Sequence, residues 1–254
     1  MHSLKEWDRL MLSWDAHRDR TERQTQAATI FFDVIRRNDW ESAMRLLGRG
    51  ASPNWVRDGF SPILIAARHG AMESVKLLLT AGASLGSVDG EGRDALWHAL
   101  LNRQDPMLDL LIAKGAEIDR RATVEQRSPL IQAAADGNFY AARALVRANC
   151  AVNARDIRGQ NALHHCLKKE APTADDVAIA RLLLENGGEP RAVDLAGKRA
   201  VDIVSDPAYV AALEAQSIAV EIQQVRDAQV AQNPTPATQK PKASAPARRK
   251  GMRL

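Results

Sequence analysis

Three adjacent side chains, His164, His165 and Cys166, have the types that could bind a metal ion. Imidazole nitrogens and thiolates are ligands that zinc prefers, but a zinc site needs further ligands at a suitable spacing. The sequence offers no such second set, and consecutive side chains of a helix point in different directions. We therefore expect no metal and no cofactor.

Catalysis by other chemistry has equally little support in the sequence. The chain has no phosphate-binding glycine loop and no acidic pair that a pocket would bring together. Thin stacked helices, which the following patterns predict, also lack the deep cavity that catalysis prefers. We therefore predict no catalytic residues and a protein that is not an enzyme.

The elements of this chain follow a repeat. Residues able to cap a helix recur at steps of 32, 33, 34 and 33, at Thr29, Ser61, Asp94, Ser128 and Asn161. A glycine or asparagine follows each of the first four caps by 21 residues and the fifth cap by 26. These residues are Gly50, Gly82, Gly115, Asn149 and Gly187. An apolar pair precedes each of these residues by four and three positions. Such a period is the signature of a supersecondary module stacked in one dimension.

Each of these positions has the chemistry that a helix pair needs. Ser, Thr, Asp and Asn accept a hydrogen bond from a free N–H at a helix start, and Pro62 and Pro129 follow two of them. Gly or Asn after the apolar pair suits a left-handed helix end. Two helices of roughly ten residues fit between cap and stop, and helices this short are stable only when packed on neighbours.

The repeat resembles the ankyrin repeat, whose pattern reads G-x-T-P-L-H-x-A-A and, at the end of its second helix, L-L-x-x-G-A. The first part is matched at residues 59–67, 92–99, 126–134 and 159–166. A degenerate copy begins near Thr29, and a last copy at Gly197 has lost its cap. His164 keeps the histidine of the family, whereas Leu64, Trp97 and Ile131 replace it, which implies altered packing within the same fold.

This resemblance implies an all-α ankyrin-repeat solenoid of stacked helix-turn-helix units, with loop or β-hairpin tips and terminal helices as caps. We expect an ankyrin repeat domain at 27–216, with repeats at 27–57, 58–90, 91–124, 125–157 and 158–195 and a degenerate repeat at 196–216. Residues 172–176 lengthen the turn of the fifth repeat, where Thr173 and Asp176 offer a new capping start.

Both ends of the chain are predicted to form separate segments. Residues 1–26 have an apolar stripe at helical spacing that includes Trp7 and Trp14, and residues 217–228 extend a similar stripe. Each helix either seals an open end of the solenoid or binds a partner. Residues 229–254 are rich in Pro, Ala and Lys without apolar periodicity, so we expect a disordered basic tail.

Charge divides between the body and this tail. The chain has 35 basic and 31 acidic residues, and residues 228–254 hold six of the basic ones and no acid, which leaves 29 basic against 31 acidic residues elsewhere. The tail either keeps the protein in solution or associates weakly with nucleic acid or another anionic surface through Arg248, Arg249 and Lys250. It has no aromatic side chain that could stack on bases.

The sequence also bears on location. It has no stretch near the ~18 apolar residues of a membrane span and no apolar secretory core at its N-terminus. We expect a cytoplasmic monomer without membrane insertion, and delivery into a host cell is the alternative. Cys150 and Cys166 stand where the repeat has small residues, so buried thiols are expected.

The resemblance to ankyrin repeats implies that a partner contacts the concave face, at the loop tips and at the ends of the inner helices. The residues that we expect to make these contacts are Arg36, Arg37, Trp55, Arg57, Phe60, Arg68, His69, Arg93, Leu101, Asn102, Arg127, Arg158, Lys168 and Lys169.

The charge of this face predicts the chemistry of the partner. Across the helix-end and tip positions nine residues are Lys or Arg and three are acidic, namely Glu91, Glu125 and Asp136. We therefore expect an acidic protein surface as the partner, with Trp55 and Phe60 as apolar anchors. The alternative is that the basic residues are ordinary solvated side chains and that Trp55 packs on a neighbouring loop.

The predicted function is that of a non-catalytic protein–protein interaction module, an adaptor or scaffold. A secreted bacterial effector, or an adaptor in secretion or toxin immunity, is an alternative that would use the same groove. Association with nucleic acid through the tail is a further alternative.

Overall fold

The computed structural model describes Lys5 and residues 20–169 and 173–203 of the 254-residue chain. The predicted stripe of the N-terminal segment, the helix at 217–228 and the tail at 229–254 lie outside these residues. The predicted boundary between residues 26 and 27 falls inside a continuous helix, Arg20–Arg36.

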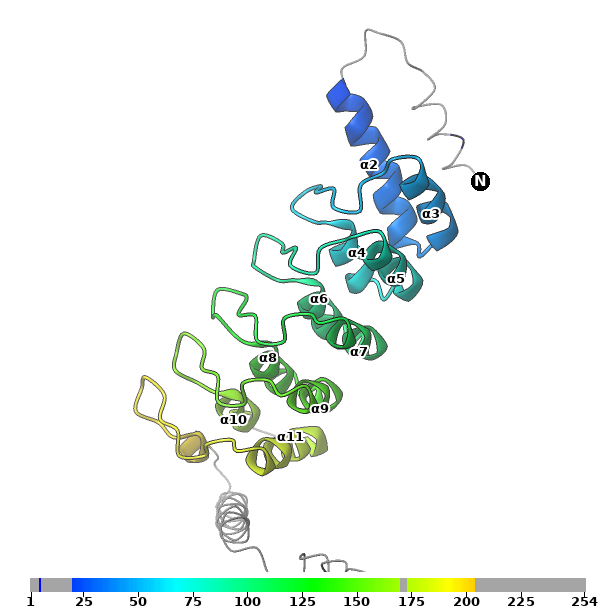
Figure 1. Ribbon diagram of the computed structural model, residues 1–254. Helices are drawn as coiled ribbons and strands as arrows, with labels where there is room; N and C mark the ends of the chain where they lie inside the picture. Colours follow the sequence, from blue (N-terminus) through cyan, green and yellow to red (C-terminus); the bar gives the residue numbers. More distant parts are fainter. Residues whose placement is uncertain (1–4, 6–19, 170–172, 204–254) are drawn as a thin grey trace, which may run out of the picture.

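The described helices form pairs that follow one another along the chain (Figure 1). The pairs are α2 (Arg20–Arg36) with α3 (Trp40–Gly48), α4 (Pro62–Arg68) with α5 (Met72–Thr80), α6 (Ala95–Leu101) with α7 (Asp105–Ala113), α8 (Pro129–Ala135) with α9 (Phe139–Arg147), and α10 (Ala162–Leu167) with α11 (Ala174–Glu185). A short 3-10 helix, η1 (Ala200–Ile203), follows the last pair. Besides helices, the described residues form isolated β-bridges at three loop tips, Arg57 with Phe60, Ala122 with Arg127 and Val193 with Arg199.

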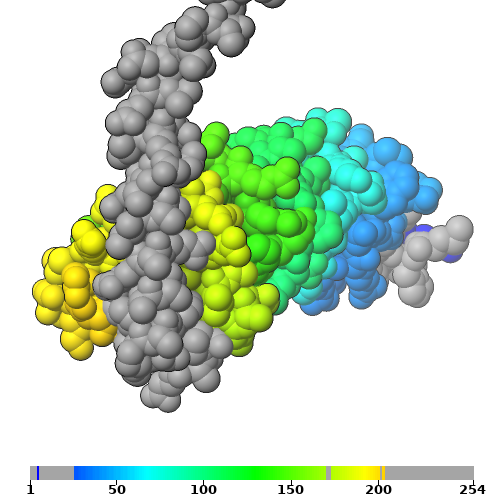
Figure 2. All heavy atoms as spheres, turned by 90° about the horizontal axis from the view of Figure 1, so that it is seen from below, coloured from blue at the N-terminus to red at the C-terminus, as the bar shows by residue number. Residues whose placement is uncertain are grey.

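The pairs stack into a solenoid. The first helices of the pairs, here called the inner helices, pack in the order α2, α4, α6, α8 and α10, and the second or outer helices form a parallel row. The loops project from the side of the inner row (Figure 1). Seen from another side, the repeats follow one another in sequence order along the molecule (Figure 2). The all-α repeat architecture is thus confirmed.

Three of the five predicted caps bind the helix start as expected. The side chains of Asp94, Ser128 and Asn161 accept a hydrogen bond from the backbone N–H three residues ahead, at 3.0, 3.4 and 3.1 Å. Ser61 has the extended backbone of a cap, but its hydroxyl makes no such bond. Thr29 caps nothing, because α2 begins at Arg20 and runs through it. The prediction at Thr29 was therefore wrong, whereas at Ser61 the predicted cap position is confirmed and only its hydrogen bond is missing.

The predicted helix stops are confirmed. Each adopts a left-handed backbone, with φ between 62° and 94°, at Gly50, Gly82, Gly115, Asn149 and Gly187. The first residue of each preceding apolar pair is completely buried, at Leu46, Leu78, Leu111, Leu145 and Leu183. Burying a leucine contributes roughly 1.5–3 kcal/mol to stability, so these five side chains are a main part of the hydrophobic core.

Two of the residues at the family's histidine position, Trp97 and His164, reach the loop that follows their helix pair. The buried Trp97 indole donates its Nε1–H to the carbonyl of Arg120 at 2.8 Å. His164 lies 2.6 Å from the cap Asn161 through Nδ1 and 3.4 Å from the carbonyl of Lys198 through Nε2. The tryptophan therefore replaces the histidine with a larger side chain that still reaches the following loop.

The insertion of the fifth repeat begins α11 as predicted. Thr173 accepts a hydrogen bond from the Asp176 N–H, and the Asp176 carboxylate accepts from the Thr173 N–H, which forms a capping box. Asp176 is fully buried, and the Lys169 ammonium lies 2.5 Å from it. The inserted turn is thus anchored by an internal ion pair.

Candidate functional site

The ends of the inner helices form a row, because the helices pack side by side. Arg36 is the last residue of α2, Arg68 of α4 and Leu101 of α6. The predicted contact residues at this level are therefore brought together in space. The others of this row are Arg37, His69, Asn102, Lys168 and Lys169.

Some cations of this row have no partner of opposite charge. Within the described residues, Arg37, Arg68 and Lys168 are exposed and have no carboxylate within 4.0 Å. The pKa of His69 is lowered, first by burial and then by the charges of Arg68 and Arg36. The positive charges of Arg68 and Arg36 therefore disfavour protonation of the His69 ring.

Other predicted cations are paired within the chain. Five of them have a carboxylate within 4.0 Å, namely Arg36 with Asp33, Arg57 with Asp58, Arg93 with Asp89 and Glu91, Arg127 with Glu125, and Lys169 with Asp176. Several of these acids stand outside the positions from which charge was counted in the sequence. The positive excess of the face is smaller than that count indicated.

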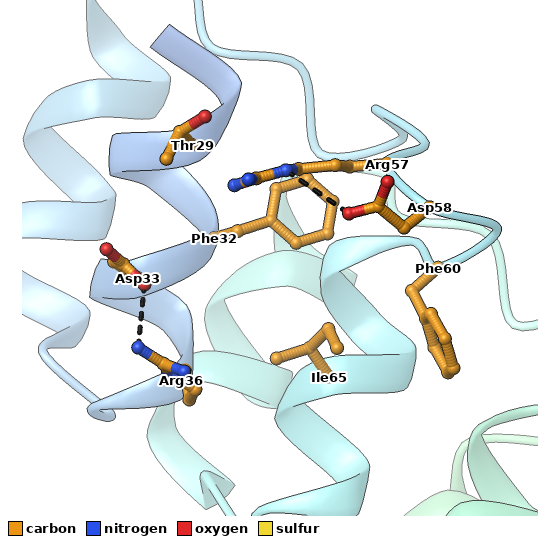
Figure 3. A pocket seen from close by; sticks show the side chains of 8 residues that line it. All are labelled: Thr29, Phe32, Asp33, Arg36, Arg57, Asp58, Phe60 and Ile65. Carbon is orange, nitrogen blue, oxygen red and sulfur yellow. Dashed lines mark hydrogen bonds and ion pairs between the residues drawn. The ribbon is translucent and has the colours of Figure 1, made fainter. Parts of the chain in front are cut away.

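One pocket lies between α2, α4 and the loop that precedes α4 (Figure 3). It has a volume of about 350 Å³, and its lining includes Arg36, Arg57 and Phe60 of the predicted contacts. Arg57 extends from its loop toward α2 over the Phe32 ring, while Arg36 rises from the end of α2 (Figure 3). Both guanidinium groups face acids of the same lining, Asp33 and Asp58, so the pocket is polar at its rim and apolar at Phe32 and Ile65.

The two predicted aromatic anchors are half-buried. Trp55 packs edge to face on Phe31 of α2, with ring centroids 6.0 Å apart, and so joins the first loop to the core. Phe60 lies 5.8 Å from the His98 ring of the next repeat. Both rings therefore hold neighbouring elements together, and only part of each is available to a partner.

The remaining predicted contacts differ in exposure. Arg158 is exposed at the tip of its loop and has no carboxylate within 4.0 Å in the described part of the chain. Leu101 is exposed at the end of α6, and Asn102 next to it donates its side-chain amide to the carbonyl of His98 at 2.8 Å.

Comparison with known proteins identifies the repeat. Residues 31–122 match the family model described as ankyrin repeats in three copies. This chain contains an ankyrin-repeat domain. A putative ankyrin repeat-containing protein of Treponema pallidum is 34% identical over 128 residues, which are 50% of this chain and 41% of that protein. The chain covers less than half of the length of the first curated relatives that it matches.

Solved structures agree in fold. The ankyrin repeat domain of Bcl-3 superposes with a TM-score of 0.66 at 22% identity, over 72% of this chain and 80% of that one. A structure of a predatory endopeptidase from Bdellovibrio bacteriovorus in complex with an immunity protein matches with a TM-score of 0.60 at 22% identity, over 75% of this chain and 96% of that one. Identities this low show the fold alone.

Three aspartates shape the tips of the ankyrin loops, and the sequence analysis missed them. Asp89, Asp156 and Asp194 each accept hydrogen bonds from the backbone N–H groups two and four residues ahead, at 2.9–3.0 Å. The sequence signal is D-x-x-G, since a left-handed glycine follows each by three residues. Burial alone would raise the pKa of Asp89 and Asp156, but their hydrogen bonds outweigh it and hold the pKa below its ordinary value.

Two histidines of the inner helices contact these aspartates. His98 Nε2 lies 3.1 Å from Asp89, and His165 Nε2 lies 2.8 Å from Asp156. Burial is the main cause that lowers the pKa of both histidines, so they are neutral at pH 7. The hydrogen bond of His165 joins the loop at Asp156 to inner helix α10, whereas His98 Nε2 lies close to Asp89 but makes no hydrogen bond in the described part of the chain.

The side chains that could do chemistry have structural partners. His164 contacts Asn161, His165 contacts Asp156 and the Cys166 thiol donates to the carbonyl of Asp176. Burial raises the pKa of the Cys150 and Cys166 thiols to about 12, so neither is a thiolate near neutral pH. In the described ranges, no three His, Cys, Asp or Glu residues are grouped to hold a metal.

One serine has a spacing that is typical of serine hydrolases but not their structure. Gly82, Ser84 and Gly86 match G-x-S-x-G, yet no strand precedes them among the described residues, and the Ser84 hydroxyl accepts from the Gly86 N–H at 3.2 Å. None of the helices in the described ranges is both long enough and apolar enough to cross a membrane.

Proposed function

We propose that this chain is a non-catalytic binding module, an adaptor, whose row of inner-helix ends contacts an acidic surface of another protein. Support comes from Arg37, Arg68 and Lys168, which are exposed at the ends of three inner helices without a carboxylate within 4.0 Å in the part of the chain that is described. Unpaired surface cations leave a field that attracts an acidic partner and speeds its approach.

The surroundings of these cations support the same partner. The one acid of the predicted row, Asp136, already accepts hydrogen bonds from the Gln132 amide at 2.9 and 3.0 Å. Arg36 and Arg57 of the nearby pocket are paired with exposed acids, and such surface pairs contribute only about 0–1 kcal/mol. A partner carboxylate can therefore compete for these guanidinium groups at little cost.

Charge reversal tests the proposal. The double variant Arg37→Glu/Arg68→Glu of the full chain is compared with the wild type in affinity capture from cells of its source, followed by affinity measurement with the captured protein at low and high salt. We expect binding roughly tenfold weaker or worse, which is about 1.4 kcal/mol, and a smaller salt dependence. The matched control is Arg147→Glu on outer helix α9, which should bind as the wild type does. Equal affinity and equal salt dependence of all three proteins would refute the proposal.

A second candidate function is inhibition of an enzyme or toxin through the same face. It is supported by the matched structure in which an endopeptidase is in complex with an immunity protein. Adding the purified chain to the captured partner distinguishes the two functions, because an immunity-type protein abolishes the partner's activity whereas an adaptor leaves it unchanged. Delivery into a host cell is a separate proposal that a secretion assay tests.

A further inference from the structure

The tips of the last three loops expose aliphatic side chains. Val124 is 87% exposed, Ile157 59% and Leu195 81%. Single exposed apolar residues are normal on protein surfaces, but contiguous apolar patches mark interaction sites. The question is therefore whether these three form one surface.

The three residues lie at the turns of consecutive loops, although in the loop of Val124 it is the neighbouring Thr123 that donates the inter-loop hydrogen bond, as Ile157 and Leu195 do in theirs. Each stands two residues before a left-handed turn residue, which is Gln126, Gly159 or Gly197. The backbone joins the loops at this level, because the Ile157 N–H donates to the carbonyl of Glu125 and the Leu195 N–H to the carbonyl of Arg158, both at 3.0 Å. We call Val124, Ile157 and Leu195 the apolar tip row.

The row is confined to the C-terminal half of the solenoid. The equivalent residues of the first two loops, two before Gly59 and Gly92, are Arg57 and Gly90. Hydrogen bonds within the loops do not require aliphatic side chains here, since it is the backbone N–H and C=O groups that form them. The packing of the core does not explain these side chains either, because most of their surface is exposed.

The free charges beside the row are positive. Asp156 and Asp194 are buried and accept the N–H groups of their own loops, and Glu125 lies 4.0 Å from Arg127. Arg158 and Lys198 are exposed and, in the described ranges, have no carboxylate within 4.0 Å. An occupant of the row therefore needs apolar side chains together with carboxylates.

We propose that the apolar tip row binds an amphipathic segment of the partner protein in which aliphatic or aromatic side chains alternate with Asp or Glu. This inference rests on the proposed function and adds an apolar anchor at the loop tips to the cationic row of helix ends. Two copies of this chain would bring Arg158 and Lys198 of both copies together in a symmetric contact, so charge opposes self-association through this row. The partner is thus defined by its chemistry.

A peptide-display selection tests the inference with a defined probe. The full chain is presented with a library of random peptides, and binding is compared with that to the triple variant Val124→Ser/Ile157→Ser/Leu195→Ser. We expect the wild type to enrich peptides that combine Leu, Ile or Phe with Asp or Glu. A synthetic peptide from this set should bind the triple variant roughly tenfold more weakly or worse. The control, Val177→Ser on outer helix α11, replaces an aliphatic residue that is 42% exposed and should keep the affinity.

The outcomes separate this inference from the proposed function. One outcome is that peptides bind the Arg37→Glu/Arg68→Glu variant with the affinity of the wild type and fail to bind the triple variant. This result supports binding at the apolar tip row independently of the proposed function. No enrichment, enrichment of Lys and Arg, or equal binding to the triple variant would overturn it, even where the partner of the cationic row is found. A lower denaturation midpoint of the triple variant would show that the chain's own residues 204–254 or a second copy cover the row, and would overturn it too. Sedimentation of the wild type tells these two occupants apart.

Discussion

Ser61 and Ser128 occupy the same position of two repeats but differ in one hydrogen bond. Both have an extended backbone and a following proline. The Ser128 hydroxyl accepts from the Ile131 N–H, whereas the Ser61 hydroxyl is buried without a hydrogen-bond partner in the described structure. A buried polar group that lacks a partner destabilises the folded state. The same residue type thus has opposite effects in two copies of one repeat.

Alanine substitution measures this difference. Ser128→Ala is expected to lower the free energy of unfolding by about 1 kcal/mol, because a helix cap is lost. Ser61→Ala is expected to leave it unchanged or to raise it, because only an unpartnered hydroxyl is removed. Chemical denaturation of both variants beside the wild type checks this. Equal losses in the two variants would mean that Ser61 caps α4 in solution.

Among the elements, α11 depends most on one side chain. The Asp176 carboxylate accepts from the Thr173 N–H and hydroxyl at 2.8 Å each and pairs with Lys169. Burial works to raise the pKa of Asp176, but the Lys169 ammonium and the Thr173 donors outweigh it and lower this pKa. A single carboxylate therefore joins the inserted turn, the end of α10 and the start of α11.

Removal of that carboxylate should be costly. Asp176→Ala is expected to lower the free energy of unfolding by about 3 kcal/mol, because the helix start loses its capping box and Lys169 loses its partner. The exposed neighbour Asp175 provides the control, and Asp175→Ala should lower it by only about 0.5 kcal/mol through the helix dipole. Urea denaturation gives both values, and similar losses in the two variants would contradict this account of α11.

At the scale of the whole molecule, the helices of each repeat in the described ranges pack chiefly on those of the neighbouring repeats, so stability is coupled along one dimension. The core is continuous from α2 to η1, and Ala27 and Ala200 mark its two ends among the described residues. A destabilising substitution in a central repeat should therefore promote local unfolding of its own helix pair before that of distant pairs.

A cavity in the central repeat tests this coupling. Leu111 of α7 is completely buried, and Leu111→Ala is expected to lower the free energy of unfolding by about 3 kcal/mol. Amide hydrogen exchange should accelerate in α6 and α7 before it does in α4 or α10. Leu101→Ala, at an exposed position of the same repeat, should cost less than about 1 kcal/mol. Uniform acceleration along the chain would instead show that the solenoid opens as a single unit.

The four described histidines make stability depend on pH. The pKa values of His69, His98, His164 and His165 are all lowered from 6.5, with burial as the largest cause. The unfolded chain therefore binds more protons than the folded one once the pH falls below about 6.5. The contribution of these histidines to the free energy of unfolding is fully present above this pH. It is lost as the pH falls toward their lower pKa values in the folded state.

We therefore expect the free energy of unfolding to decrease between pH 7.5 and pH 5. The double variant His98→Gln/His165→Gln should show a shallower decrease, since Gln132 already occupies the equivalent position of the intervening repeat. Denaturation midpoints at a series of pH values measure both slopes. A decrease that is just as steep in the double variant would exclude these two histidines as its cause.

The sequence by itself determined the helix pairs, their left-handed ends and the buried leucines of the core. These features depend on hydrogen bonds and backbone angles within a few residues, and on a period that the chain repeats five times. The predicted cap at Thr29 was wrong because the residues before it are also helical, so that α2 runs through this position.

Only the tertiary structure decided which predicted contacts are free to bind. Lys169 is neutralised by Asp176 and Trp55 is held by Phe31, whereas Arg68 has no carboxylate within 4.0 Å in the described part of the chain. Arg120 meets Asp94 from 26 residues away, and the loop of Ile157 adjoins the loop of Val124 through the hydrogen bond from the Ile157 N–H to the Glu125 carbonyl. Charge pairing and exposure depend on neighbours that stacking brings together, so they cannot be inferred from local patterns.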